Sequence, residues 1–438
     1  MSPALIITVS THGYIHYLTL YCKFCRAQSP VTPSPTDAIQ LNLLDALDPQ
    51  EGVAHDYFGM NVAIDMVGKY LISGSPYSDT KGMADSGAAN IYALNETDGS
   101  WEHLIRLSAS DMEVNSLFGF DVAISGSTAV VSAHTFGDGG VYVFGRIGTD
   151  GPWVQQAKLE ESSGVGGDRF GVSVALAGDT LLVGADHYNS TGLNCGAVFI
   201  YKRKYFAWRK VQTLVPDNCS SNAFFGRSIR FNDESDHQFI VGSIGDSANG
   251  ESSGSVYIYS YNPSITTWEM EAHLFPLDGR NGDAFGVSAA LNADLAVVGA
   301  YTDDTDYGGF DVGSAYIFRR VSSNSWVQVT KLESSDGMGG DGFGSHVALH
   351  RNVVLVGAPG DDVSDEGTDT RGAVYLYSLD NTSGAWEELK KISGTHSNAK
   401  LGTAVAIHER SIFIGASHET VDGLEGRGII FSYELVCV

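Results

Sequence analysis

The chain has 438 residues, of which 43% are hydrophobic and 18% are charged, a composition that suits a folded protein. Its formal net charge of −26 argues against binding to nucleic acid or to anionic membrane surfaces, and favours cations or basic partners. The 52 glycines follow no triplet period, which excludes a collagen-like fibre and predicts many tight turns.

The first segment of the chain is apolar. Residues 4–21 form the most hydrophobic run, but polar residues interrupt it, so it is a poor membrane span. Ala27 follows as a small residue at which a signal peptidase could cut. We expect residues 1–27 to be a signal-peptide-like or anchor segment, and residues 28–37 to be a linker rich in proline and serine.

From residue 38 to residue 438 the chain repeats itself. Segments similar to FGVSVALAGDTLLVGAD, the copy at 170–186, recur at intervals of 52 to 60 residues. Each copy opens on an aromatic-glycine pair, weakened to leucine-glycine in the last: Phe58, Phe118, Phe170, Phe225, Phe285, Phe343 and Leu401. A long, regular period indicates a repeat architecture.

Within one repeat, four short segments carry strand patterns. They are 172–178 (VSVALAG), 180–185 (TLLVGA), 196–202 (GAVFIYK) and 208–215 (WRKVQTLV), with turn residues between them. A single four-stranded meander cannot bury both of its faces. We therefore expect an all-β fold, a seven-bladed β-propeller of four-stranded antiparallel blades, over residues 38–438.

Each of the first six repeats contains one tryptophan. An aliphatic residue follows six positions later in every case, and an even spacing along a strand predicts that both side chains lie on the same face. We expect these pairs to pack between blades. The tryptophans are Trp101, Trp153, Trp208, Trp268, Trp326 and Trp386.

The last repeat contains three predicted strands and no tryptophan-led fourth strand. Residues 41–59 align without a gap on residues 326–344, with Leu41 and Leu47 in the places of Trp326 and Leu332. We therefore expect this N-terminal segment to pair with residues 429–433, completing the last blade and closing the ring, because an open ring would leave an unpaired apolar edge.

The motif that opens and closes these repeats resembles that of a known family. Phe-Gly at the start and Gly-Ala-Pro at the end of the second strand, intact as VGAP at 356–359, are similar to the FG-GAP repeat of integrin α-subunit propellers. The resemblance implies an adhesion-like interaction module that belongs to the cell surface or is secreted. It also implies calcium sites in the hairpin between the first two strands.

Those calcium sites are not expected here. Most of these hairpins are too short to supply the six to eight oxygens that calcium prefers. The longer hairpin of the fourth repeat has Asp233, Glu234 and Asp236 but lacks the glycine of a calcium loop. The 13 histidines show no HxH or HExxH spacing. We therefore assign no metal site from the motifs and expect no required cofactor.

Acidic residues gather instead in two loops that follow second strands. Because these loops share one rim of a propeller, we interpret their carboxylates as candidate ligand-binding residues, with a weak calcium site as a further hypothesis. The alternative is that aspartate and glycine simply make good turns. The candidates are Asp303, Asp304, Asp306, Asp311, Asp361, Asp362, Asp365 and Asp369.

Other residues bear on the compartment. Cys195 and Cys219 fall in loops of the same rim, where a disulfide could join them. Glycosylation sequons begin at Asn95, Asn189, Asn218 and Asn381. Both features favour a secreted or cell-surface glycoprotein.

No catalytic pattern is evident in the sequence, so no catalytic residue is assigned. We expect a non-enzymatic, monomeric interaction domain that binds a protein or glycan ligand through the acidic, loop-rich rim, and does not bind nucleic acid or membrane surfaces. The alternative is a polysaccharide-active enzyme whose carboxylate pair is assembled across blades, which a sequence cannot reveal.

Overall fold

The computed structural model describes residues 39–437 apart from 135–138, 149–150, 162–166, 191, 206, 218, 305–308, 363–368 and 381. The signal-like segment and the linker expected at 1–37 lie outside this description. Residues 43–434 form one compact unit, and the described residues 39–42 and 435–437 belong to a second. In the described part of the chain, no helix is long and apolar enough to cross a membrane.

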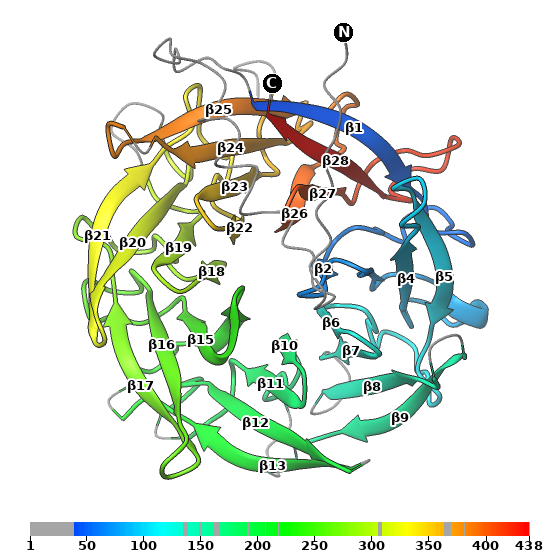
Figure 1. The fold of residues 1–438 in the computed structure, drawn as a ribbon, viewed down its shortest axis with the longest axis horizontal. Coiled ribbons are helices and arrows are strands. Elements are labelled where there is room, and N and C mark those ends of the chain that lie inside the picture. Colours follow the sequence, from blue (N-terminus) through cyan, green and yellow to red (C-terminus); the bar gives the residue numbers. More distant parts are fainter. Residues whose placement is uncertain are drawn as a thin grey trace, which may run out of the picture. The chain divides into compact units, whose positions relative to one another are not determined.

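The regular structure of the described residues consists of short strands and one 3-10 turn, η1 (Thr80–Gly82), joined by turns and loops (Figure 1). The first three meanders are β2 (Val62–Ile64), β3 (Tyr70–Ser75), β4 (Ala88–Leu94) and β5 (Trp101–Leu107); β6 (Val122–Ser125), β7 (Thr128–Ala133), β8 (Gly140–Arg146) and β9 (Trp153–Leu159); and β10 (Ser173–Ala177), β11 (Thr180–Ala185), β12 (Ala197–Lys204) and β13 (Ala207–Leu214).

The next three meanders are β14 (Phe225–Asn232), β15 (Ser235–Ser243), β16 (Ser255–Asn262) and β17 (Thr267–Leu274); β18 (Ala289–Leu291), β19 (Leu295–Ala300), β20 (Ser314–Ser322) and β21 (Ser325–Leu332); and β22 (His346–His350), β23 (Val353–Ala358), β24 (Ala373–Leu379) and β25 (Trp386–Ser393). The remaining strands are β26 (Leu401–His408), β27 (Ser411–Ala416), β28 (Ile429–Cys437) and β1 (Ile39–Leu47).

Each meander forms an antiparallel four-stranded sheet in sequence order, as expected for propeller blades. The sheets β14–β17 and β18–β21 are joined by one parallel pair, Asn232 with Leu291, into a sheet of eight strands. Within the unit of residues 43–434, the strands that open the meanders lie nearest its centre, and the strands that end them lie outside (Figure 1). The all-β prediction is therefore correct.

The N-terminal strand β1 is the edge strand of the last sheet. The last sheet has the order β1-β28-β27-β26, so β1 occupies the outer position that a fourth strand takes in the other sheets. Leu47 is only 3% exposed and belongs to an apolar cluster with Phe58, Phe413 and Ile430. This cluster joins the last meander to the first.

The Phe-Gly and Gly-Ala motifs meet where neighbouring meanders touch. A Cβ added to Gly74, in the second strand of the first meander, would lie 1.9 Å from the carbonyl oxygen of Gly119, in the Phe-Gly pair of the next. A similar contact, at 2.0 Å, links Gly415 to Gly59. Each aromatic anchor is fully buried, and Phe58 forms a backbone bridge with Gly428 as Phe118 does with Gly87. The motif therefore marks backbone crowding between blades.

One expectation about the tryptophans is wrong. They do pack between sheets, but the aliphatic residue six positions later lies on the opposite face: Trp268 belongs to one core cluster and Leu274 to the next. The reason is a β-bulge three residues after each tryptophan, where one residue has no partner on the neighbouring strand and the alternation of faces shifts. The bulged residues are Leu104, Gln156, Val211, Glu271, Val329 and Leu389.

Candidate functional site

Two of the predicted acidic residues are buried in the framework of the loops. Asp303 is 2% exposed, accepts a hydrogen bond of 2.9 Å from the hydroxyl of Tyr316 and lies 2.7 Å from Nζ of Lys331. Asp361 is 3% exposed and has the same partners in the next repeat, Tyr375 at 2.8 Å and Lys391 at 2.7 Å. These carboxylates are neutralised and hold the loops in place.

The other described candidates lie nearer to solvent. Oδ1 of Asp304 accepts a hydrogen bond from the backbone N–H of the exposed Asp311, at 3.0 Å. Asp362 is half-buried, and Asp369 forms an ion pair of 2.7 Å with Arg371. Asp306 and Asp365 lie outside the described residues. The rim is therefore less negative than the composition of its loops suggests, and the weak calcium site stays a prediction.

The same rim displays large apolar side chains. Phe310, in the loop between β19 and β20, is 80% exposed, and Leu277, in the connection between β17 and β18, is 81% exposed. Nη1 of Arg280 donates to the backbone carbonyl of Asp304 at 2.9 Å and so joins the two loops. The carbonyl of Phe310 accepts a hydrogen bond from Gly340 N at 3.0 Å. These side chains are thus presented from a fixed backbone.

The cysteines of this rim are paired as the sequence suggested. A disulfide joins Cys195 and Cys219, whose Cα atoms lie 5.9 Å apart. It ties the loop between β11 and β12 to the connection that follows β13. Asn95 and Asn189 lie in the described loops, whereas Asn218 and Asn381 fall outside the described residues.

At the centre of the unit, the strands that open the meanders surround a cavity of about 380 Å³ on the side of these loops. Its polar wall includes Arg227, Arg230 and Lys400, which is unexpected in so acidic a chain. Both arginines stand where the preceding repeat has Val172 and Ala175. The sequence analysis missed this feature, although the replacement of apolar residues by arginine in one repeat was a usable signal.

The cationic side chains act on the histidines of this cavity. Burial, together with the charges of Arg230 and Arg227, lowers the pKa of His346 to about 4. Burial and the charge of Lys400 likewise lower the pKa of His418 to about 4. Asp121 lies 3.8 Å from Arg230, and burial raises the pKa of its carboxyl. The cavity can therefore accept an anionic group.

One arrangement in the cavity invites comparison with nucleophilic catalysis. Oγ of Ser417 lies 2.9 Å from Nδ1 of His418. A histidine with a pKa of about 4 binds a proton weakly near neutral pH, so it is a poor general base for the serine hydroxyl. The two residues are also neighbours in sequence, at the start of a loop. This pair therefore gives no support to hydrolytic chemistry.

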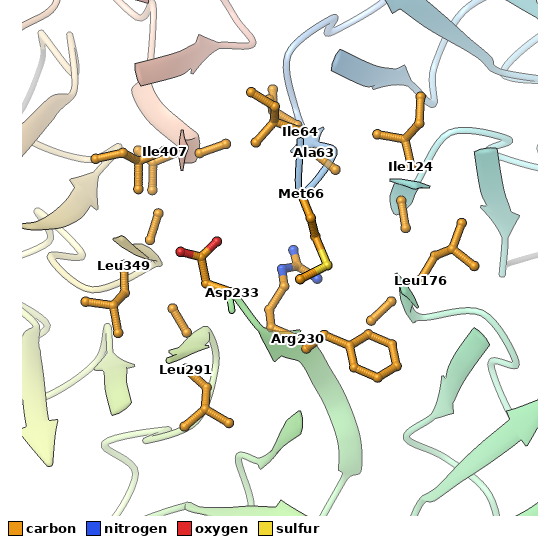
Figure 2. A pocket seen from close by; sticks show the side chains of 18 of the residues that line it. Ala63, Ile64, Met66, Ile124, Leu176, Arg230, Asp233, Leu291, Leu349 and Ile407 are labelled. Carbon is orange, nitrogen blue, oxygen red and sulfur yellow. The ribbon is translucent and has the colours of Figure 1, made fainter. Parts of the chain in front are cut away.

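Below this cavity lies a narrower apolar section of about 170 Å³ (Figure 2). Equivalent residues of successive repeats line it, among them Ile124, Leu291 and Ile407. Arg230 and Asp233 are the charged side chains that Figure 2 shows among them, both from the fourth repeat. The opposite ends of the central space thus differ in polarity.

Four-stranded meanders repeated around a central cavity define a β-propeller repeat protein. The family model for the FG-GAP repeat matches residues 101–144, 153–201, 208–259, 268–318 and 326–377, more than half of the chain. The chain belongs to the FG-GAP repeat family. Each match begins at a tryptophan and ends in the third strand of the following meander. Comparison with curated proteins found no similar sequence.

Proposed function

We propose that this protein is a non-enzymatic interaction module that binds a protein or glycan ligand outside the cell or at its surface. Its scaffold, in this proposal, is a closed seven-bladed propeller in which the N-terminal strand completes the last blade. The neighbouring positions of β1 and β28 and the contact between Gly415 and Gly59 support closure. No cofactor is required by this proposal, and calcium would bind weakly if at all.

The observation that carries the proposal is the exposed apolar surface of the rim around the fifth repeat. Phe310 and Leu277 each expose about four fifths of their side chains on loops that hydrogen bonds hold to one another and to the framework. Large apolar side chains on a preorganised backbone, with carboxylates such as those of Asp304 and Asp311 nearby, are typical anchors of binding interfaces. Exposed apolar side chains of this size are unfavourable in water, so their presence on the surface indicates an interaction site.

A glycan array and a cell-surface protein extract test this proposal with one set of variants. We expect the wild-type protein to bind a defined glycan or protein and to release no reducing sugar from a bound glycan. Phe310→Ser and Leu277→Ser should each weaken that binding at least about tenfold, because anchor residues commonly contribute more than 1 kcal/mol.

The matched control is Val114→Ser, which removes a half-exposed apolar side chain from a connection of the second repeat. It should leave binding unchanged. If Phe310→Ser and Leu277→Ser bind as the wild type does, the ligand-binding surface lies elsewhere. Release of product from a bound polysaccharide would instead establish the enzymatic alternative.

A further inference from the structure

Three potential metal ligands from three different repeats meet at the narrow end of the central space. One donor atom each from Asp233, His350 and His408 lies within 4.8 Å of the others. Asp233 begins the turn between β14 and β15, and the two histidines end β22 and β26. In Figure 2 the carboxylate of Asp233 points into the cavity between Leu349 and Ile407, the residues that precede the two histidines.

The two histidines occupy the same position of their repeats, and Asp233 lies one position further along in its own, eight residues after Phe225. His350 and His408 lie seven positions after Phe343 and Leu401 respectively. The same position is Asp65 in the first repeat and Asn292 in the fifth. The first strands of three repeats thus bring these residues together at one end of the central space. Strands position both histidines, and the turn that follows β14 positions Asp233, so most of the site rests on regular structure.

A second observation points to an ion at this place. His350 is only 8% exposed, its Nδ1 lies 2.5 Å from Oδ2 of Asp233, and its Nε2 is buried without a hydrogen-bond partner. A contact this short places a carboxylate oxygen and an imidazole nitrogen side by side. Metal ligands must be deprotonated, so an ion bound between these two atoms would take the place of the proton that they share.

We propose that Asp233, His350 and His408 bind a divalent transition-metal ion, for which zinc is the best match. Zinc is commonly held by histidine nitrogens and carboxylate oxygens at about 2.0–2.2 Å. Two such ligands at a tetrahedral angle are about 3.3 Å apart, so donors now within 4.8 Å need to move by about 1 Å. Three protein ligands leave a fourth position for water or for a group of a bound ligand.

The charges around these residues are compatible with a cation. Two further carboxylates lie close in the fold: Asp65 is on the hairpin whose Gly68 faces the His408 ring, and Glu409 follows His408 in the chain. Arg230 lines the same section, but its guanidinium lies 3.8 Å from Asp121. Two nitrogen ligands, with a carboxylate from a third repeat, distinguish this site from calcium loops, which use oxygens within one hairpin.

Cobalt(II) and zinc binding by the full chain, after removal of metals with a chelator, test the proposal. We expect one zinc ion per chain by isothermal titration calorimetry. We also expect cobalt(II) to give the intense visible absorption of a tetrahedral site that contains nitrogen ligands. Asp233→Asn, His350→Asn and His408→Gln should each weaken zinc binding by at least about tenfold, the lower end of what loss of a supporting residue costs.

The matched controls are His237→Gln and His396→Gln. Each of these histidines also lies 2.5 Å from a carboxylate, Asp236 or Glu419, but on the surface. They should leave zinc binding unchanged. Absence of zinc binding by the wild type, or equal binding by the folded Asp233→Asn and His408→Gln variants, overturns the proposal and leaves Asp233 and His350 as an ion pair. Asp233 is partly exposed, so its variant should fold even if His350→Asn does not.

Discussion

At the scale of single residues, the aspartates of the rim look alike in the sequence but occupy different environments in the structure. Asp56, Asp283 and Asp341 are buried and accept hydrogen bonds from backbone N–H groups three residues earlier, at 3.1, 2.5 and 2.7 Å. They close the turns that precede the Phe-Gly anchors. Asp303 and Asp361 bind lysines instead. Among the described residues of the rim, exposed members such as Asp311 differ from both of these buried groups.

The buried turn aspartates should make stability depend on pH. Burial raises the pKa of Asp341 to about 6, so the folded protein holds this proton more tightly than the unfolded chain does. The stabilisation from the protonated form is complete below the ordinary carboxyl pKa and is lost as the pH rises through about 6. Asp341→Asn keeps an acceptor for Met338 N and removes the charge. We expect it to stabilise the protein at pH 8 by about 1–2 kcal/mol.

Thermal unfolding at pH 4 and pH 8 measures this effect. The melting temperature of Asp341→Asn should exceed that of the wild type at pH 8 and match it near pH 4. The exposed Asp217 provides the control, since Asp217→Asn should change neither value. An equal effect of Asp341→Asn at both pH values would show that its charge does not oppose folding.

The lysines beneath the rim lead to a second prediction at this scale. Lys331→Met removes the partner of the buried Asp303 and should cost about 3 kcal/mol, because an uncompensated buried charge remains. Lys158 occupies the equivalent position in the second repeat, but its partner Asp111 is 45% exposed. Lys158→Met should therefore cost less than about 1 kcal/mol.

Urea denaturation of both variants provides the comparison. Adding Asp303→Asn to Lys331→Met should recover part of the lost stability, because the second change removes the unpaired charge. If the double variant is no more stable than Lys331→Met, the loss arises from packing around the lysine chain rather than from charge.

At the scale of elements, the bulge in each outer strand determines how neighbouring blades join. Trp268 faces the meander on one side and Leu274 faces the meander on the other, so one strand supplies apolar side chains to two interfaces. The side chain of the bulged Glu271 is buried, and it accepts a hydrogen bond from Nε1 of Trp326 in the next meander at 3.0 Å and one from Nε2 of Gln238 in its own meander at 2.7 Å. The bulge is thus part of the architecture.

Deletion of the bulged Val211 tests this role. Val211 is 57% exposed, so Val211→Ala should change stability by less than about 0.5 kcal/mol. Deleting the residue restores strict alternation and turns either Trp208 or Leu214 to the wrong face. We expect a loss of at least about 3 kcal/mol in chemical denaturation, comparable to removal of a large core side chain. A deletion variant as stable as Val211→Ala would show that the strand tolerates either register.

At the scale of the whole molecule, the contacts between the two ends of the repeat array carry the proposed closure. Leu47 lies in the apolar cluster with Phe58 and Phe413, whereas Leu44 of the same strand is 50% exposed. Leu47→Ala should cost about 2–5 kcal/mol and Leu44→Ala almost nothing. Deleting residues 38–48 should destabilise all blades together.

Thermal unfolding and size-exclusion chromatography check these variants. We expect the deletion to lower the melting temperature in a single cooperative transition and to promote aggregation through the exposed edge of β28. Equal stabilities of Leu47→Ala and Leu44→Ala would mean that β1 contributes nothing to closure.

The sequence alone determined the repeat and its strands, because each Phe-Gly anchor and each apolar second strand is a local pattern that backbone crowding imposes on every blade. It also indicated the place of β1, since Leu41 and Leu47 match the outer strand of a complete repeat. Only the structure showed which interface each side chain of that outer strand faces. The bulge changes the alternation of faces, and bulged residues as different as Val211 and Glu271 give no sequence signal for it.

Only the tertiary structure decided which side chains share a site. Asp233 and His350 are 117 residues apart, and three repeats must reach one level of the central space before they and His408 can meet. The same holds for the rim, where Lys331 neutralises Asp303 across a sheet and Asp311 remains exposed. Period and composition describe each repeat by itself, whereas burial and charge partners depend on how strands distant in sequence pack together.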